Sequence, residues 1–291
     1  MTPATVASYR SSLRDFARFL GGRSITDFQE IDRDAIRDYI QLMRKDRKLR
    51  LATVENHLSC ITSFLEYLEY EGEIESNPAP AVRKRYLRQY KAEVPDAESR
   101  RLITIEQLRQ LVDAIMIPRD RALIMLLAKT GIRRGELVGI DLADVDLVAL
   151  RIKLKPKAKR SNRVVFFDQE CARVLQDWLS VRKRYARDCP ALFITETGGR
   201  LDRSGVYLVV TKHAQRVGLH DATSERLEDH FTPHCLRHWF TTYLRRNGMP
   251  REMIQELRGD IRREAIDVYY HIDAEQLRTA YLRYMPKLGV R

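Results

Sequence analysis

The chain has 291 residues, more than one hydrophobic core usually organises, so we expect two domains. Its composition, 44% hydrophobic and 32% charged, excludes a disordered chain and is typical of a globular protein. The 52 Lys and Arg residues outnumber the 40 Asp and Glu residues to give a net charge of +12, which favours a polyanionic partner such as nucleic acid.

The first 82 residues predict a small all-helical bundle. Apolar residues recur at three- and four-residue spacing in the stretches 6–20, 31–43 and 54–68. Gly21 and Gly72 end the first and third stretches, and Asn77-Pro78 breaks the pattern. Nothing here alternates as a strand would.

Two basic segments of the first hundred residues are candidate DNA contacts, because each Lys or Arg near a phosphate adds to counterion release. The segment 83–100, RKRYLRQYKAEVPDAESR, is read as an extended interdomain linker, although a solvated linker that touches nothing explains it too. The candidate residues are Arg44, Lys45, Arg47, Lys48, Arg50, Arg83, Lys84, Arg85, Arg88 and Lys91.

The remainder, 101–291, predicts helices around one small sheet. Thr104 and Gln107 fit a helix capping box, and the helix after Pro118 ends at Gly131. The period then changes: 150–155 alternates apolar and basic residues, and 163–167 is β-branched and aromatic, which with 145–148 predicts a small antiparallel sheet. Helices are expected again near 169, at 204–217 and, after a polar stretch, to about 283.

Other features exclude whole classes of protein. No stretch approaches the roughly 18 apolar residues of a membrane span, and the first ten residues lack a signal core. The four cysteines (Cys60, Cys171, Cys189 and Cys235) form no C-x-x-C pair, which argues against a disulfide scaffold or a zinc site. We expect a cytoplasmic, soluble protein.

The segment T-G-I-R-R-G-E-L at 130–137 places an arginine at a helix corner. Gly131 can supply the left-handed turn that closes the preceding helix, so Arg133 begins the next one and can present its fork of donors to a phosphate. Taken alone, the motif is read more readily as a surface arginine after a helix cap.

The segment T-P-H-C-L-R-H at 232–238 pairs a histidine with an arginine. Thr232 suits the N-cap and Pro233 the first helical position. His234 and Arg237 then share one face at the positive end of the helix, where they can hold a phosphate and move a proton. A capped surface helix explains the pattern equally well.

Two further segments carry candidate groups. Lysines at 155–160, K-P-K-A-K-R, fall in the turn between two expected strands and can reach a ligand over the sheet, although turn lysines are usually only solvated. The segment A-I-D-V-Y-Y-H at 265–271 carries two tyrosines, and paired tyrosines on a helix are more often packing residues than nucleophiles.

Taken in order, T-G-x-R-x-x-E-L, a basic β-turn, H-x-L-R-H and V-Y-x-H resemble the tyrosine recombinase or phage integrase family, the Xer-type branch most closely. The resemblance covers essentially the whole chain; the set is specific, although each motif alone is weak. It implies a mainly α fold with an N-terminal SAM-like, core-binding helical bundle at 1–82 and a basic linker at 83–100. A mixed, mainly α catalytic domain with a small antiparallel β-sheet follows at 101–291.

The resemblance implies a role for each matching residue. Arg133 and Arg237 match the two catalytic arginines, and Glu136 matches the acidic residue that supports the first of them. His234 matches the histidine of the H-x-x-R motif.

Near the C-terminus, Tyr269 falls at the position of the family's nucleophile, with Tyr270 as its rival, and His271 completes the common Y-x-H ending. The catalytic lysine belongs on the β-turn. This turn is longer than the usual pattern, so we favour Lys159, with Lys157 second.

One departure stands out. The family usually has Leu-Gly-His, or a tryptophan for that histidine, nine residues before the tyrosine, where this chain reads L-R-G-D and ends the motif with Asp260. Asp260 can accept a hydrogen bond, but its carboxylate would repel a phosphate. Either Asp260 orients Tyr269 or Arg258 through a different bond, or His238 or His271 substitutes, or catalysis is weakened.

The resemblance implies site-specific strand breakage and rejoining through a 3′-phosphotyrosine. The intermediate keeps a reactive phosphodiester, so no ATP is needed, and two arginines neutralise the transition state without a metal. The expected partner is a double-stranded DNA recombination site, bound by dimers or tetramers, and no membrane is involved. Residues 273–291 are expected to pack either into a neighbouring copy or onto their own domain.

Other functions remain open. Asp260 is consistent with a catalytically silent DNA-binding protein that acts as an accessory or regulatory factor. The chain nevertheless retains the motif residues Arg133, His234, Arg237 and Tyr269, which argues against that function. A type IB topoisomerase-like enzyme fits the motif spacing and the compact length less well. A basic structural nucleic-acid binder would explain the charge but not the ordered motifs.

Overall fold

The computed structural model describes residues 3–93, 102–156, 163–185, 188–260 and 272–290, with the backbone alone at 3–4, 88–93 and 163. The chain forms two compact units, Met1–Ala97 and Glu98–Arg291. None of the helices within the described ranges is long and apolar enough to cross a membrane.

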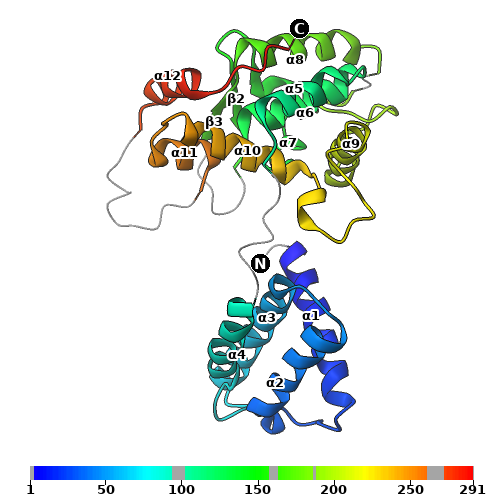
Figure 1. The fold of residues 1–291 in the computed structure, drawn as a ribbon, viewed down its shortest axis with the longest axis vertical. Helices are drawn as coiled ribbons and strands as arrows, with labels where there is room; N and C mark the ends of the chain where they lie inside the picture. Colours follow the sequence, from blue (N-terminus) through cyan, green and yellow to red (C-terminus); the bar gives the residue numbers. More distant parts are fainter. Residues whose placement is uncertain (1–2, 94–101, 157–162, 186–187, 261–271, 291) are drawn as a thin grey trace. The chain divides into compact units, whose positions relative to one another are not determined.

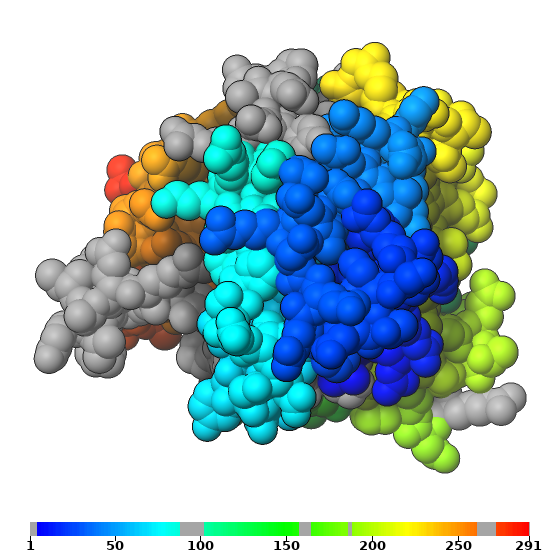
Figure 2. Space-filling model, turned by 90° about the horizontal axis from the view of Figure 1, so that it is seen from below, coloured from blue at the N-terminus to red at the C-terminus, as the bar shows by residue number. Residues whose placement is uncertain are grey.

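The N-terminal unit is the helical bundle that the sequence predicts. Its elements are α1 (Pro3–Gly21), η1 (Phe28–Glu30), α2 (Arg33–Gln41), the π-helical turn η2 (Leu42–Asp46), α3 (Leu51–Tyr70) and α4 (Ala79–Glu93). Apolar faces of all four α-helices meet in one core, where Ile36, Tyr39, Leu58 and Leu65 are fully buried (Figure 1). In Figure 2 the cyan residues, which include those of α4, lie beside blue residues of this unit, and α4 packs against α2 and α3.

The expectation of an extended linker from residue 83 was wrong for 83–93, which form most of α4. Most residues of this stretch are strong helix formers. Ala79, Val82 and Leu87, at helical spacing, are buried in the core of the N-terminal unit, and that packing fixes the helix. The remaining part of the expected linker, 94–100, lies outside the described residues.

The C-terminal unit is mainly helical with one small sheet, as predicted. Its helices are α5 (Ile105–Asp113), α6 (Pro118–Thr130), α7 (Arg134–Leu137), η3 (Leu142–Asp144), α8 (Gln169–Arg182), α9 (Arg203–Arg216), η4 (Leu227–Asp229), α10 (Pro233–Arg246), α11 (Arg251–Arg258) and α12 (Ala274–Tyr284). Every residue from 122 to 128 in α6 is at most 1% exposed, because α5, α8, α9 and α10 all pack on this helix (Figure 1).

The sheet has the order β1-β2-β3 and is antiparallel throughout. Its strands are β1 (Val145–Asp146), β2 (Arg151–Leu154) and β3 (Arg163–Phe166). Ile152 pairs with Val165, and both are buried. The exposed Arg151 and Lys153 alternate with the buried Ile152 and Leu154, which is the period that predicted the strand.

The C-terminal segment packs onto its own unit, one of the two arrangements expected for it. The fully buried Lys129 donates to Asp168 (2.6 Å), to Glu170 (2.8 Å) and to the carbonyl of Pro286 (2.8 Å). Glu170 in turn accepts the backbone N–H groups of Leu288 (2.9 Å) and Gly289. A buried ion cluster therefore fastens the end of the chain to α6 and α8.

Candidate active site

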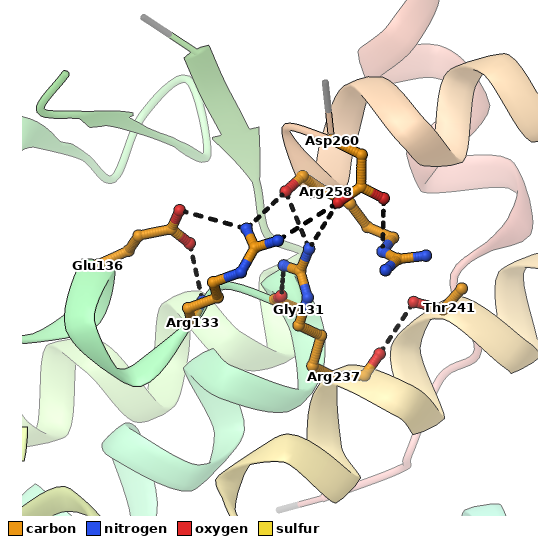
Figure 3. A network of polar contacts seen from close by, with 7 residues as sticks. All are labelled: Gly131, Arg133, Glu136, Arg237, Thr241, Arg258 and Asp260. Carbon is orange, nitrogen blue, oxygen red and sulfur yellow. Dashed lines mark hydrogen bonds and ion pairs between the residues drawn. The ribbon is translucent and has the colours of Figure 1, made fainter. Parts of the chain in front are cut away.

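Arg133 is placed by a helix end and a helix start. Gly131 closes α6 in the left-handed conformation (φ 59°), and Arg133 is the N-cap residue of α7. Glu136 accepts the backbone N–H of Arg133 at 2.8 Å, and its other carboxylate oxygen lies 3.7 Å from Nη1 of the same arginine. Glu136 thus holds both the backbone and the side chain of Arg133 (Figure 3).

Arg237 reaches the same place from α10. Pro233 takes the first helical position, as expected, and the Arg237 side chain is only 4% exposed. Its guanidinium donates to the carbonyl of Gly131 and, at 3.0 Å, to the carbonyl of Arg258. The carbonyl that ends α6 is therefore also an anchor for the second arginine.

The end of α11 supplies the third side of the site. The Arg258 carbonyl accepts from Nη1 of Arg133 at 3.4 Å as well as from Arg237. One Asp260 oxygen, Oδ1, lies 3.4 Å from Nη2 of Arg133 and 3.3 Å from Nη2 of Arg237. The other, Oδ2, lies 3.1 Å from Nε of Arg258, so three guanidinium groups surround one carboxylate (Figure 3).

Burial and the neighbouring charges of this cluster change the pKa of Arg237. Burial, reinforced by the positive charges of Arg133 and Arg258 and opposed by Asp260 and Glu136, lowers the pKa of Arg237 to about 9. Arg237 therefore remains a cation at neutral pH. Its charge is poorly solvated, which strengthens its attraction for an anion that replaces water.

An open cleft of about 540 Å³ lies beside the arginines. Arg133, Glu136, His234 and Arg237 all line it, so the structure brings together four of the residues that the motifs singled out. His234 and His238 are both exposed.

Sequence reasoning missed Arg203 and Tyr207, which line the cleft from α9. A Cβ on Gly135 would lie 3.0 Å from Nε of Arg203, so the glycine leaves room for that guanidinium. Nothing local marks Arg203, a single arginine on the first turn of a capped helix. The sequence singles out Arg258 only as a neighbour of Asp260. Its contacts to the two motif arginines are made by its backbone carbonyl, and no sequence pattern reveals such a contact.

Tyr269, Tyr270, His271, Lys159 and Lys157 lie outside the described residues. Asp260, by contrast, contacts Arg258, one of the arrangements considered for it, and contacts both motif arginines as well.

The basic residues expected to contact DNA differ in what they do in the structure. Arg44 donates to the carbonyl of Leu49 at 2.8 Å and Arg47 to Asp15 at 2.6 Å, so both also stabilise the N-terminal unit. Lys45, Lys48, Arg50, Lys84 and Arg85 are exposed and Arg83 is half-buried, whereas the side chains of Arg88 and Lys91 lie outside the described residues.

Comparison with known proteins gives one consistent result. The model of the phage integrase family matches residues 101–276, and the model of the phage integrase N-terminal SAM-like domain matches residues 1–72. The tyrosine recombinase XerC of Herpetosiphon aurantiacus is 28% identical over 95% of this chain and 87% of its own length. XerC of Haemophilus influenzae (strain Rd) is 25% identical over 99% of this chain and 92% of its own.

Solved structures share the fold. A XerH recombinase bound to its difH substrate has a TM-score of 0.64 at 22% identity, covering 94% of this chain and 78% of that one. The Tn1549 transposon integrase in complex with a circular-intermediate DNA has a TM-score of 0.72 at 17% identity, covering 97% of this chain and 94% of that one.

Proposed function

This chain belongs to the phage integrase family of tyrosine recombinases, enzymes that cleave and rejoin DNA, and from that premise we propose how its own residues carry out the reaction. Tyr269 attacks a phosphodiester held by Arg133 and Arg237 and forms a 3′-phosphotyrosine, without a metal or ATP. The observation that supports this most is the convergence of the two guanidinium groups on one anionic oxygen beside an open cleft.

The two arginines suit the transition state because they are already held in position. Glu136 fixes Arg133, and the carbonyl groups of Gly131 and Arg258 fix Arg237. Negative charge accumulates on the non-bridging oxygens as a phosphodiester becomes pentacoordinate, and preorganised donors stabilise that charge without first reorganising. A single donor of this kind is typically worth roughly 10²–10³ in rate.

The reaction exchanges one phosphoester bond for another. The Tyr269 oxygen forms the new bond to phosphorus, and the bond to the 5′ oxygen breaks. Tyrosine has a reference pKa of about 10, so it needs help to lose its proton. His234, which lines the cleft, is the candidate base, and Lys159 is the candidate donor of a proton to the leaving 5′ oxygen. A second 5′ hydroxyl then attacks the phosphotyrosine and reverses these transfers.

The partner is a double-stranded DNA recombination site. Relatives have been solved on such DNA: XerH bound to difH, and a lambda integrase dimer bound to a COC′ core site. We place the exposed lysines and arginines of 45–50 and 84–85 on backbone phosphates, and we expect dimers or tetramers on DNA in the cytoplasm, at the nucleoid.

A suicide-substrate assay tests the proposal. Wild-type protein, Tyr269→Phe and Tyr270→Phe are mixed, without metal, with nicked duplexes selected for binding to the protein, and denaturing gels reveal any covalent complex. We expect a covalent band that only Tyr269→Phe abolishes, with DNA binding retained. A band lost only in Tyr270→Phe would move the nucleophile to its neighbour.

A second candidate function is a catalytically silent DNA-binding protein of the same fold. The Asp260 carboxylate within the arginine cluster favours it, because an anion there opposes a phosphate. Absence of any covalent band with wild-type protein, on DNA that it binds, would support this reading and refute the catalytic one.

A further inference from the structure

The Asp260 carboxylate contacts Arg133 and Arg237 with the geometry expected of a bound phosphate. A single oxygen, Oδ1, receives one donor from each of Arg133 and Arg237, and the second oxygen faces Arg258 (Figure 3). Two guanidinium groups converging on one anionic oxygen is also the arrangement expected for a non-bridging phosphate oxygen. The donors that the proposed reaction needs are therefore already engaged by a carboxylate of the same chain.

The lengths of these contacts indicate that they can be exchanged. The two distances from Oδ1, 3.3 and 3.4 Å, exceed the roughly 2.7–2.9 Å of strong charge-assisted hydrogen bonds. By comparison, Glu136 accepts the backbone N–H of Arg133 at 2.8 Å, and the Arg258 carbonyl accepts from Arg237 at 3.0 Å. Backbone carbonyls thus anchor Arg237 more closely than Asp260 does. For Arg133, Glu136 holds the backbone, while the guanidinium lies 3.4 Å from both the Arg258 carbonyl and Asp260.

The Asp260 carboxylate has a second contact, with Arg258, that it can keep when it leaves the arginine pair. Its Oδ2 lies 3.1 Å from Nε of Arg258, and the side chains of Asp260 and Arg258 are 25% and 33% exposed. A small rotation of the carboxylate can release Oδ1 from the pair while Oδ2 keeps its contact with Arg258. An incoming phosphate and Asp260 cannot both keep the same donors, because two anions at hydrogen-bond distance from one guanidinium repel each other.

We propose that Asp260 is an internal competitor for the phosphate: it engages Arg133 and Arg237 in the DNA-free enzyme and yields them when a phosphodiester enters, remaining on Arg258. This inference rests on the proposed role of the two arginines as phosphate ligands. In the absence of phosphate, the carboxylate of Asp260 in the R-G-D sequence at 258–260 thus neutralises part of the positive charge of the anion site. Arg258 is a positioning residue for the displaced carboxylate.

Binding of inorganic phosphate tests the proposal without knowledge of the DNA site. The midpoint of thermal unfolding, followed by tryptophan fluorescence in the full-length protein, is measured against phosphate concentration at constant ionic strength and pH. Asp260→Asn removes the competing charge and is expected to bind phosphate about tenfold more tightly than wild type. The matched control Glu252→Gln removes one exposed negative charge from α11, the helix that precedes Asp260, and should leave phosphate affinity unchanged.

Unchanged phosphate binding by Asp260→Asn would overturn the proposal, because the carboxylate would then not compete with phosphate. Weaker binding would overturn it too, because the carboxylate would then support the arginine pair. If that variant does not fold, Asp260→Ala gives the same comparison.

A second variant tests the resting place of the carboxylate. Arg258→Gln should weaken phosphate binding in the wild-type background and weaken it less when Asp260→Asn is also present. Equal effects in both backgrounds would refute the role given to Arg258.

Arg133→Gln separates this proposal from the proposed function. Combined with Asp260→Asn, it should abolish the gain in phosphate affinity. Retention of the gain would show that phosphate binds elsewhere and would count against the role of the arginine pair itself. Loss of phosphate binding on Arg133→Gln, together with no effect of Asp260→Asn, would reject only the competitor role.

Discussion

Gly131 contributes both to the packing of the C-terminal unit and to the position of Arg237, so its replacement by alanine should lower both stability and activity. The residue ends α6 at φ 59°, and its carbonyl accepts a hydrogen bond from Arg237. A Cβ added there would lie 2.4 Å from Cδ1 and 2.7 Å from Cγ of Phe240, a residue that is itself 1% exposed. The ring cannot move away without disturbing the core between α6 and α10.

The expected loss of stability is the sum of two costs. The left-handed conformation costs an L-residue about 1–2 kcal/mol, and overpacking of a filled core costs about 1–3 kcal/mol. Gly131→Ala should therefore lower the free energy of unfolding by roughly 2–5 kcal/mol. Gly218→Ala is the matched control: its φ is +70° and a Cβ there meets nothing within 4 Å, so only the backbone cost applies.

Urea unfolding followed by tryptophan fluorescence measures this difference cleanly. The chain has two tryptophans, and both Trp178 and Trp239 lie buried in the C-terminal unit, so the signal reports that unit whether or not the N-terminal unit unfolds with it. Gly131→Ala should also reduce trapping of covalent DNA, because the carbonyl anchoring Arg237 shifts. Equal losses of stability in the two alanine variants would refute the argument from Phe240.

Three further outcomes are expected. Lys129→Met should lower the free energy of unfolding by about 3–5 kcal/mol, because it leaves Asp168 and Glu170 together without their cation; a loss below about 1 kcal/mol in urea unfolding would contradict this. Burial by itself would raise the pKa of Glu170, but the Lys129 bond and the backbone N–H groups of the C-terminal segment outweigh it and lower that pKa below the ordinary 4.5. Glu170 therefore stabilises the fold fully above pH 4.5 and loses that contribution as the pH falls through its lower folded value, so unfolding measured from pH 3 to 6 should show a decline that Glu170→Gln flattens. Arg237→Ala should slow covalent trapping by roughly 10²–10³ while changing DNA affinity far less; a change in affinity alone would make it an ordinary phosphate contact.

The sequence by itself determined the helical architecture and the candidate chemistry. Helical periodicity, the Thr104 capping box and the alternation at 150–155 are local signals, and the structure bears them out. The ordered motifs identify the family, and they name Arg133, Glu136, His234 and Arg237, which line one cleft.

Only the tertiary structure decided what surrounds those residues. Lys129 looks like a helix-surface lysine in the sequence, yet it is fully buried among two carboxylates and the C-terminal segment. Residues 83–93 carry the charge of a linker, but the burial of Leu87 makes them part of a helix in the bundle. The carbonyl of Arg258 and the carboxylate of Asp260 meet the arginine pair because α11 packs against α10. Helix periods and caps depend on residues a few positions apart, so a sequence pattern can reveal them. These contacts join distant segments instead. They are decided by burial and by the direction of the backbone, which no local pattern records.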